Sequence, residues 1–81
     1  FNAHTVIRYQ LSKDVQVSIE IYDVLGQKVR TLINERQGAG NYAVIWNGTN
    51  DCGTDVSTGV YLCRLQTDNK YSLTRKLLLL R

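Results

Sequence analysis

The sequence has no proline, no methionine and a single histidine among its 81 residues. No cysteine or acidic residue is next to His4 in the sequence, whereas acid–base catalysis needs a base, an orienting group and a pocket. We therefore interpret His4 as a surface residue and expect the chain to be no enzyme, with no catalytic residue and no cofactor. The lack of proline is unusual for a chain with many turns, and nothing in the sequence accounts for it.

Long apolar runs and blocks of like charge are also missing. Leu77–Leu80 is far shorter than the roughly 18 residues that a membrane-spanning helix needs, so no transmembrane segment is expected. The formal net charge is +3 and the ten Lys and Arg residues are scattered, which argues against a nucleic-acid partner. The first residues lack the charged lead and apolar stretch of a signal peptide, and the missing initiator methionine indicates a fragment of a longer protein.

A chain of 81 residues is expected to form one domain with a thin core. Cys52 lies in a polar loop and Cys63 in an apolar stretch. A disulfide needs Cα atoms within about 7 Å, so we favour two free thiols, and the sequence leaves a bridge open. The spacing of the two cysteines matches no zinc site.

Apolar and polar residues alternate along several short segments. The clearest case is 15–22, where Val15, Val17, Ile19 and Ile21 are expected to face a core. Turn residues separate this segment from further expected strands at 5–11, 27–33, 41–47, 59–67 and 71–80. Asn34–Gly40 and residues 47–58 are expected to be loops.

Two of these segments also fit a helical period, namely 25–33 and 73–80. We favour strands, because Gly26 lies where a helix would begin and the hairpin Asp68–Lys70 would pair the last segment with its predecessor. Six or seven short strands in so short a chain predict an all-β fold, an antiparallel β-sandwich. Neither face of a single sheet of this size could be covered otherwise.

Within the expected loop 47–58, residues 47–55 hold four side chains with oxygen atoms, which calcium prefers as ligands: Asn47, Asn50, Asp51 and Asp55. The order of an EF-hand loop is not met, because Cys52 stands where that loop has glycine. Asn and Asp are also the residues that tight turns use, so turn formation is the favoured interpretation.

Trp46 has two interpretations. An exposed indole could stack on a sugar, as in carbohydrate-binding modules. Tyr42 and Val44 share its side of the expected strand, which favours a tryptophan that faces the core.

The last segment is apolar and flanked by cations, from Arg75 to Arg81. An edge strand exposes unpaired amides and carbonyls to which another chain can add. The alternative is a buried final strand whose charged flanks limit aggregation. The two interpretations are compatible, because a buried strand can leave a charged end accessible.

Motifs in a fixed order cover nearly the whole chain: Phe1-Asn2, Ile21–Val29, Trp46-Asn47-Gly48, Gly59-Val60-Tyr61, and Arg75-Lys76-Leu77 with Arg81. Together they resemble the C-terminal sorting domain of type IX secretion cargo and its relative, the immunoglobulin-like domain of the flagellar hook-capping protein. One departure is Ala3, which stands where the family usually has proline.

The resemblance implies an immunoglobulin-like sandwich of about seven strands, residues 1–81, at the C-terminus of a secreted protein. In that family the folded domain is an address that an outer-membrane translocon reads after Sec export, and a surface sortase then often removes it. The implied location is extracellular or the cell surface, after passage through the periplasm, with a cargo domain linked on the N-terminal side.

The resemblance also assigns residues. Recognition would fall on Gly59, Val60, Tyr61, Arg75, Lys76, Leu77, Leu78, Leu79, Leu80 and Arg81. The turns and core would depend on Asp23, Gly26, Trp46, Asn47 and Gly48. Two other functions stay open: a structural spacer or assembly domain of the hook-cap or fibronectin type, and a carbohydrate-binding module.

Overall fold

A computed structural model describes residues 4–81, and the motif Phe1-Asn2 with Ala3 lies outside the described residues. Six strands form the domain: β1 (Thr5–Leu11), β2 (Val15–Tyr22), β3 (Lys28–Gln37), β4 (Gly40–Trp46), β5 (Gly59–Thr67) and β6 (Ser72–Leu79). The described residues contain no helix long and apolar enough to cross a membrane.

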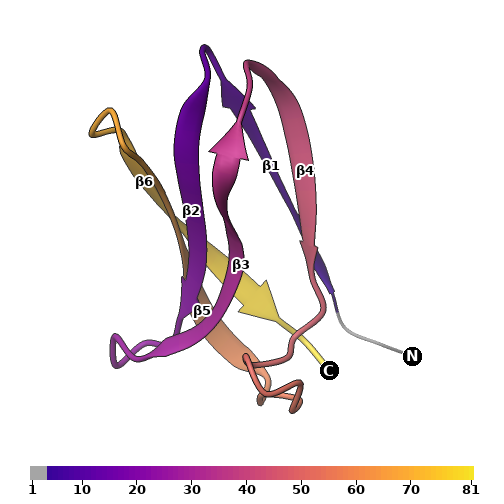
Figure 1. Cartoon of the computed structure of the whole chain (residues 1–81). Coiled ribbons are helices and arrows are strands. Elements are labelled where there is room, and N and C mark those ends of the chain that lie inside the picture. The colour runs from indigo at the N-terminus through magenta and orange to yellow at the C-terminus, as the bar shows by residue number, and fades with distance from the viewer. Residues whose placement is uncertain (1–3) are drawn as a thin grey trace.

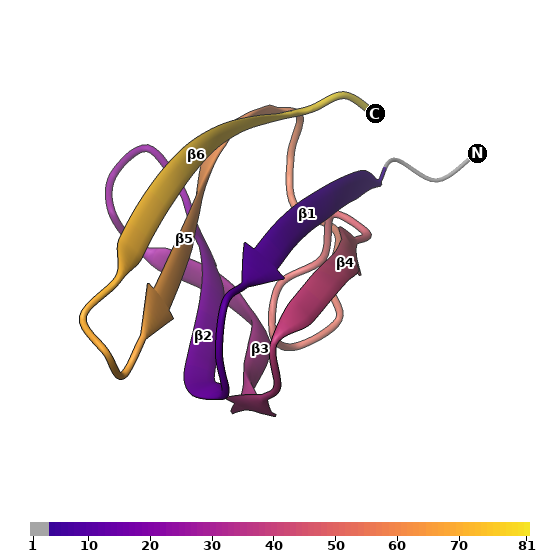
Figure 2. The same ribbon diagram turned by 90° about the horizontal axis from the view of Figure 1, so that it is seen from above.

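The strands form two antiparallel sheets, β1-β4 and β3-β2-β5-β6. The two-stranded sheet lies opposite the curved four-stranded sheet, as the views in Figures 1 and 2 show. This confirms the expected β-sandwich. The strand count is six rather than about seven, because residues 47–58 contribute only the isolated bridge between Thr49 and Asp55.

The core comes from the alternation within strands. Val15, Val17, Ile19 and Ile21 of β2 are at most 4% exposed, as their period-2 spacing predicts. Alternate residues of β1, β5 and β6 are at most 9% exposed and form the core together with β2 and with Trp46 of β4: Ile7, Tyr9, Leu11, Tyr61, Cys63, Leu65, Leu77 and Leu79. Both sheets therefore contribute one apolar face to a single core.

The predicted loop at 34–40 is wrong, because β3 continues to Gln37 and pairs there with Val15 of β2. The pairing of β2 with β3 is interrupted by register shifts at Ile19/Glu20 and Ile21/Tyr22. These shifts leave Leu32 and Val29 of β3 without a partner in register. An extra residue changes the phase of the alternation, which explains why this strand also fitted a helical period.

Candidate functional site

Several of the residues assigned to recognition lie where β6 ends beside the loop 47–58, whereas Arg75 and Lys76 lie in the middle of β6. Arg81 is the centre of this contact. Its guanidinium donates hydrogen bonds to the carbonyl oxygens of Gly48 and Val56, and its Nη2 lies 3.6 Å from Asp55 Oδ1. The Arg81 amide donates to Thr58 Oγ1 at 3.0 Å. The end of the chain is therefore tied to a loop more than twenty residues earlier in the sequence.

The Trp46-Asn47-Gly48 turn lies directly under Arg81. Trp46 is 0% exposed, and its Nε1 donates to the Thr49 carbonyl at 2.9 Å. Gly48 has φ of +76°, and an added Cβ would lie 2.6 Å from Arg81 Nη2. Glycine is thus required twice here, for the backbone conformation and for the space that Arg81 occupies.

The burial of Trp46 agrees with the predicted core position. The carbohydrate-binding hypothesis required an exposed indole and is wrong for this reason. Instead the ring contacts Tyr61 edge-on, with centroids 5.0 Å apart and an interplanar angle of 71°. Such a pair adds about 0.5–1.5 kcal/mol to the burial of the two rings.

Asn47 closes the turn with its side chain. Its Oδ1 accepts a hydrogen bond from Thr49 Oγ1 at 2.6 Å and one from Arg30 Nη1 at 3.2 Å. Arg30 belongs to β3, so the turn is held from the four-stranded sheet as well.

Gly59-Val60-Tyr61 begins β5 and is paired with the end of β6. Gly59 lies opposite Leu79, and Val60 lies opposite Leu78. The Tyr61 hydroxyl donates to the Ser57 carbonyl at 2.6 Å, four residues earlier. A buried tyrosine that bonds back to the preceding backbone fixes the entry into a strand, as in the tyrosine corner of immunoglobulin-like domains.

The final apolar run is divided between core and surface. Leu77 and Leu79 are 9% and 1% exposed, whereas Leu78 and Leu80 are 59% and 62% exposed. Both interpretations of this segment therefore describe part of it. The helical alternative is wrong, because Ser72–Leu79 pairs with β5 as a regular strand.

Arg75 and Lys76 lie on opposite sides of β6. Arg75 Nη1 reaches across to β1 and donates to the Arg8 carbonyl at 2.7 Å. Lys76 lies opposite Leu62, and the alternation along β6 places it on the outer face of the sheet. At the outer face, a partner could contact only those predicted recognition residues whose side chains point outward. These are Val60, Lys76, Leu78 and Leu80.

The β2–β3 turn lies at the same end of the molecule as the loop 47–58 (Figure 1). Asp23 Oδ1 accepts hydrogen bonds from the Leu25 and Gln27 amides at 2.9 and 3.0 Å, and Gly26 has φ of +84°. These are the forward bonds and the left-handed glycine that the turn sequence predicts. Asp51 ties the loop to β3, because its Oδ1 accepts from the Thr31 amide at 3.0 Å.

The oxygen side chains of the loop 47–58 are used by the turns themselves. Asn50 Oδ1 accepts from the amides of Cys52 and Thr54, both at 3.0 Å. Within the described part of the chain, no cluster of three His, Cys, Asp or Glu side chains has the geometry of a metal site. Turn formation accounts for Asn50, whereas Asp51 bonds to β3 and Asp55 lies beside Arg81.

The two cysteines are free thiols, as favoured from the sequence. Cys52 is exposed in the loop and Cys63 is buried in β5. Burial raises the pKa of the Cys63 thiol, and the charge of nearby Arg75 opposes that shift to a lesser degree. A buried, protonated thiol is a packing group rather than a nucleophile.

Comparison with known protein families identifies the family of this chain. A family model described as the FlgD Ig-like domain matches residues 2–70. The chain belongs to the FlgD Ig-like domain family. The match covers β1 to β5 and the loop 47–58, and it ends in the hairpin before β6.

The solved structures support the FlgD-like fold. A crystal structure of FlgD from P. aeruginosa is similar, with a TM-score of 0.72 and 22% sequence identity. The similarity covers 94% of this chain and 60% of that one, so the chain spans less than two thirds of the solved relative. The search of curated protein sequences gave no match.

Sequence reasoning missed the contact that organises this end of the domain. Arg81 was predicted as a recognition residue, yet its side chain is only 28% exposed and is bonded to the Gly48 and Val56 carbonyls. The sequence offered only a glycine in a turn, Gly48, and a cation 33 positions later, Arg81. A local pattern cannot show that two such segments meet.

Proposed function

We propose that this chain is a non-catalytic structural and assembly module of the hook-cap type within a longer protein. The observation that carries the proposal is the FlgD Ig-like family match over residues 2–70. The FlgD-like sandwich supports it, because two sheets around one core form a unit that can hold neighbouring parts at a defined distance.

The packing at the end of the sandwich that holds Arg81 and the loop 47–58 suits a mechanical role. The start of β1 and the end of β6 lie at the same end of the sandwich (Figure 1). Arg81 and the loop 47–58 close that end with several hydrogen bonds. Flanking chain would then join a stiff end, while the turns at the opposite end stay free for contacts.

The test is made in the parent protein. Residues 4–81 are replaced by a Gly/Ser linker of similar span, and the size of the assembled particle is measured by light scattering. We expect assembly to be lost while the remaining domains keep their own melting transitions. Normal assembly with the linker would contradict the assembly role.

A second candidate is the type IX sorting module, and the geometry of β6 favours it. Leu78 of the edge strand β6 and Leu80, just beyond the strand, are both more than half exposed. An outer-membrane translocon and a surface sortase would read this folded surface, and the linked N-terminal cargo would reach the cell surface or the medium.

Deleting residues 71–81 would not test sorting cleanly, because the deletion also removes Leu77 and Leu79 from the core. The sharper variant is Leu78→Ser with Leu80→Ser, which changes exposed side chains only. Ile45→Ser, at a residue 60% exposed on β4, is the matched control.

Sorting predicts that the double variant leaves the parent protein in the periplasm while the control is exported. Both variants should melt at the wild-type temperature. Wild-type surface levels of the double variant would exclude the exposed leucines as the sorting signal. The linker experiment tests the assembly role independently.

A further inference from the structure

β1 and β6 are edge strands of different sheets, and each has a strand partner on one side only. Their ribbons are neighbours in the view of Figure 2. Arg75 Nη1 of β6 links the two sheets and donates to the Arg8 carbonyl of β1 at 2.7 Å. The Arg8 carbonyl therefore accepts a donor from outside its own sheet, as an edge acceptor does.

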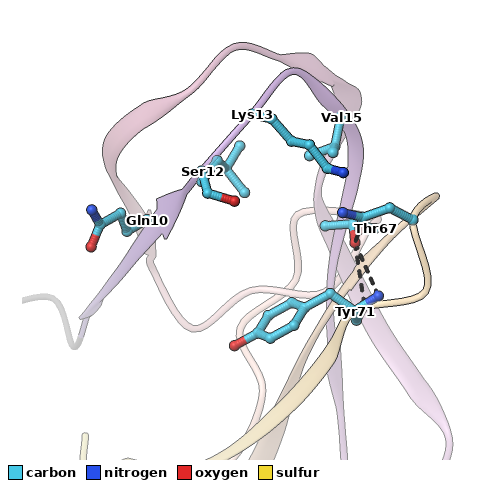
Figure 3. Close-up of a pocket in the computed structure, with 8 residues that line it drawn as sticks. Gln10, Ser12, Lys13, Val15, Thr67 and Tyr71 are labelled. Atoms are coloured by element: carbon cyan, nitrogen blue, oxygen red, sulfur yellow. Dashed lines mark hydrogen bonds between the residues drawn. The ribbon is translucent and has the colours of Figure 1, made fainter.

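Two hollows are lined by residues of β1, and the second of them also by Arg75. One of about 330 Å³ lies between the Ser12-Lys13 turn and the start of β6, where Thr67 and Tyr71 line it (Figure 3). The other, of about 390 Å³, is lined in part by Arg8 and Arg75. Gln10 of β1 lines both hollows. We call them together the β1–β6 trough.

The trough is positively charged. Its lining includes three cations and no carboxylate among residues 4–81: Arg8, Lys13 and Arg75. The acids of the neighbouring turns are engaged elsewhere, because Arg36 binds Asp14 at 2.8 Å and Asp68 at 3.4 Å. An anionic ligand would therefore meet cations without competing carboxylates.

The opposite edge of the four-stranded sheet is less open. Asp51 bonds both to the Val29 carbonyl, through its amide, and to the Thr31 amide, through Oδ1, at 3.1 and 3.0 Å. The loop 47–58 thus covers part of the β3 edge. Tyr71, which directly precedes β6, is 53% exposed.

We propose that the β1–β6 trough binds an extended, acidic peptide segment of a partner protein. The segment pairs its backbone with the free edge of β6, and its carboxylates face Lys13 and the guanidinium groups of Arg8 and Arg75. Backbone pairing supplies affinity and the alternating side chains supply specificity. This inference goes beyond the assembly role, since it concerns the side of the sandwich away from the Arg81 contact.

The experiment uses the 81-residue chain and two labelled peptides of alternating valine with glutamate and of alternating valine with lysine. Fluorescence anisotropy measures binding, and amide chemical shifts locate it. We expect only the glutamate peptide to bind, with affinity that falls as NaCl rises. The shifted amides should lie in residues 8–13 and 71–75.

The key variants are Lys13→Glu and Arg75→Glu, and Lys76→Glu is the matched control. Each variant replaces a cation by a carboxylate, so all three change the net charge equally. Lys76 neighbours Arg75 but faces the other side of β6. The trough variants should weaken binding about tenfold and the control less than twofold. Lys13 is exposed in a turn, so its variant keeps the test valid even if Arg75→Glu destabilises the fold.

Other outcomes would overturn the proposal. Equal binding of the lysine peptide would exclude charge recognition, and equal weakening by Lys76→Glu would show attraction to net charge alone. Shifts confined to β3 would place the site elsewhere. Self-association that buries the β6 edge would make a second copy of the chain the occupant.

Discussion

Replacing Gly48 with alanine should cost much more stability than the same change at Gly53. Both glycines lie in the loop 47–58 with left-handed backbones, at φ of +76° and +81°. A Cβ at Gly53 would meet nothing within 4 Å, whereas at Gly48 it would lie 2.6 Å from Arg81 Nη2 and 3.2 Å from Leu79 Cδ1. The two variants therefore share the backbone strain and differ in the Arg81 contact.

The magnitude follows from these two contributions. A non-glycine residue in the left-handed region costs about 1–2 kcal/mol, which is the whole expected effect of Gly53→Ala. At Gly48 the guanidinium of Arg81 must also leave its carbonyl partners. Hydrogen bonds from a charged donor contribute about 1.5–3 kcal/mol, and partial exposure of Arg81 lowers this to about 1–2 kcal/mol. Gly48→Ala should then cost about 2–4 kcal/mol.

Arg81→Ala separates the contributions. Alone it should cost about 1–2 kcal/mol, through the lost hydrogen bonds. Combined with Gly48→Ala it should add almost nothing, because the first change has already displaced the guanidinium. The double-mutant cycle should therefore show a coupling of about 1–2 kcal/mol.

Urea unfolding followed by the fluorescence of Trp46 measures the wild type and all four variants, since this indole is the only one in the chain and is buried in the folded state. Equal costs at Gly48 and Gly53 would refute the role of Arg81. Strict additivity of Gly48→Ala and Arg81→Ala would refute the contact between them.

The remaining predictions concern the core, a turn and a thiol. Trp46→Ala should cost about 3–5 kcal/mol, because a fully buried ring leaves a cavity, and an unchanged urea midpoint would contradict this. Gly26→Val should lower the melting temperature, since a β-branched residue tolerates positive φ poorly, and a wild-type melting curve would show that the turn adapts. Iodoacetamide should modify Cys52 first and Cys63 only at higher pH or on unfolding, as mass spectrometry of the labelled peptides would report. Because the folded state holds the Cys63 proton more tightly, the free energy of unfolding should fall as pH rises above the ordinary thiol pKa; a rise with pH would contradict that sign.

Local patterns in the sequence predicted most of the strands. β1, β2 and β5 have the bounds expected from alternation, because residues of one strand face must recur every second position. The Asp23–Gly26 turn was equally predictable, since glycine and aspartate act within four residues of chain. β3 was predicted too short, because its last residues are polar and are held by pairing with β2 rather than by burial.

The candidate site was predictable only in part. Trp46 and Gly48 were expected to be structural, and their burial and backbone conformation agree with that. The run 77–80 was expected to act as one segment, but alternation divides it between the core and the outer face. Its roles in docking or sorting remain predictions for the experiments above.

The sequence alone determined the strand-and-turn order, since each element depends on residues within a few positions of one another. Tertiary structure decided which strands became neighbours, and hence the order β3-β2-β5-β6 and the free edge of β6. It also decided that Arg81 meets Gly48 and that Arg75 reaches Arg8, 67 positions away. Such contacts depend on the register of whole strands across the core, which no short window of residues encodes.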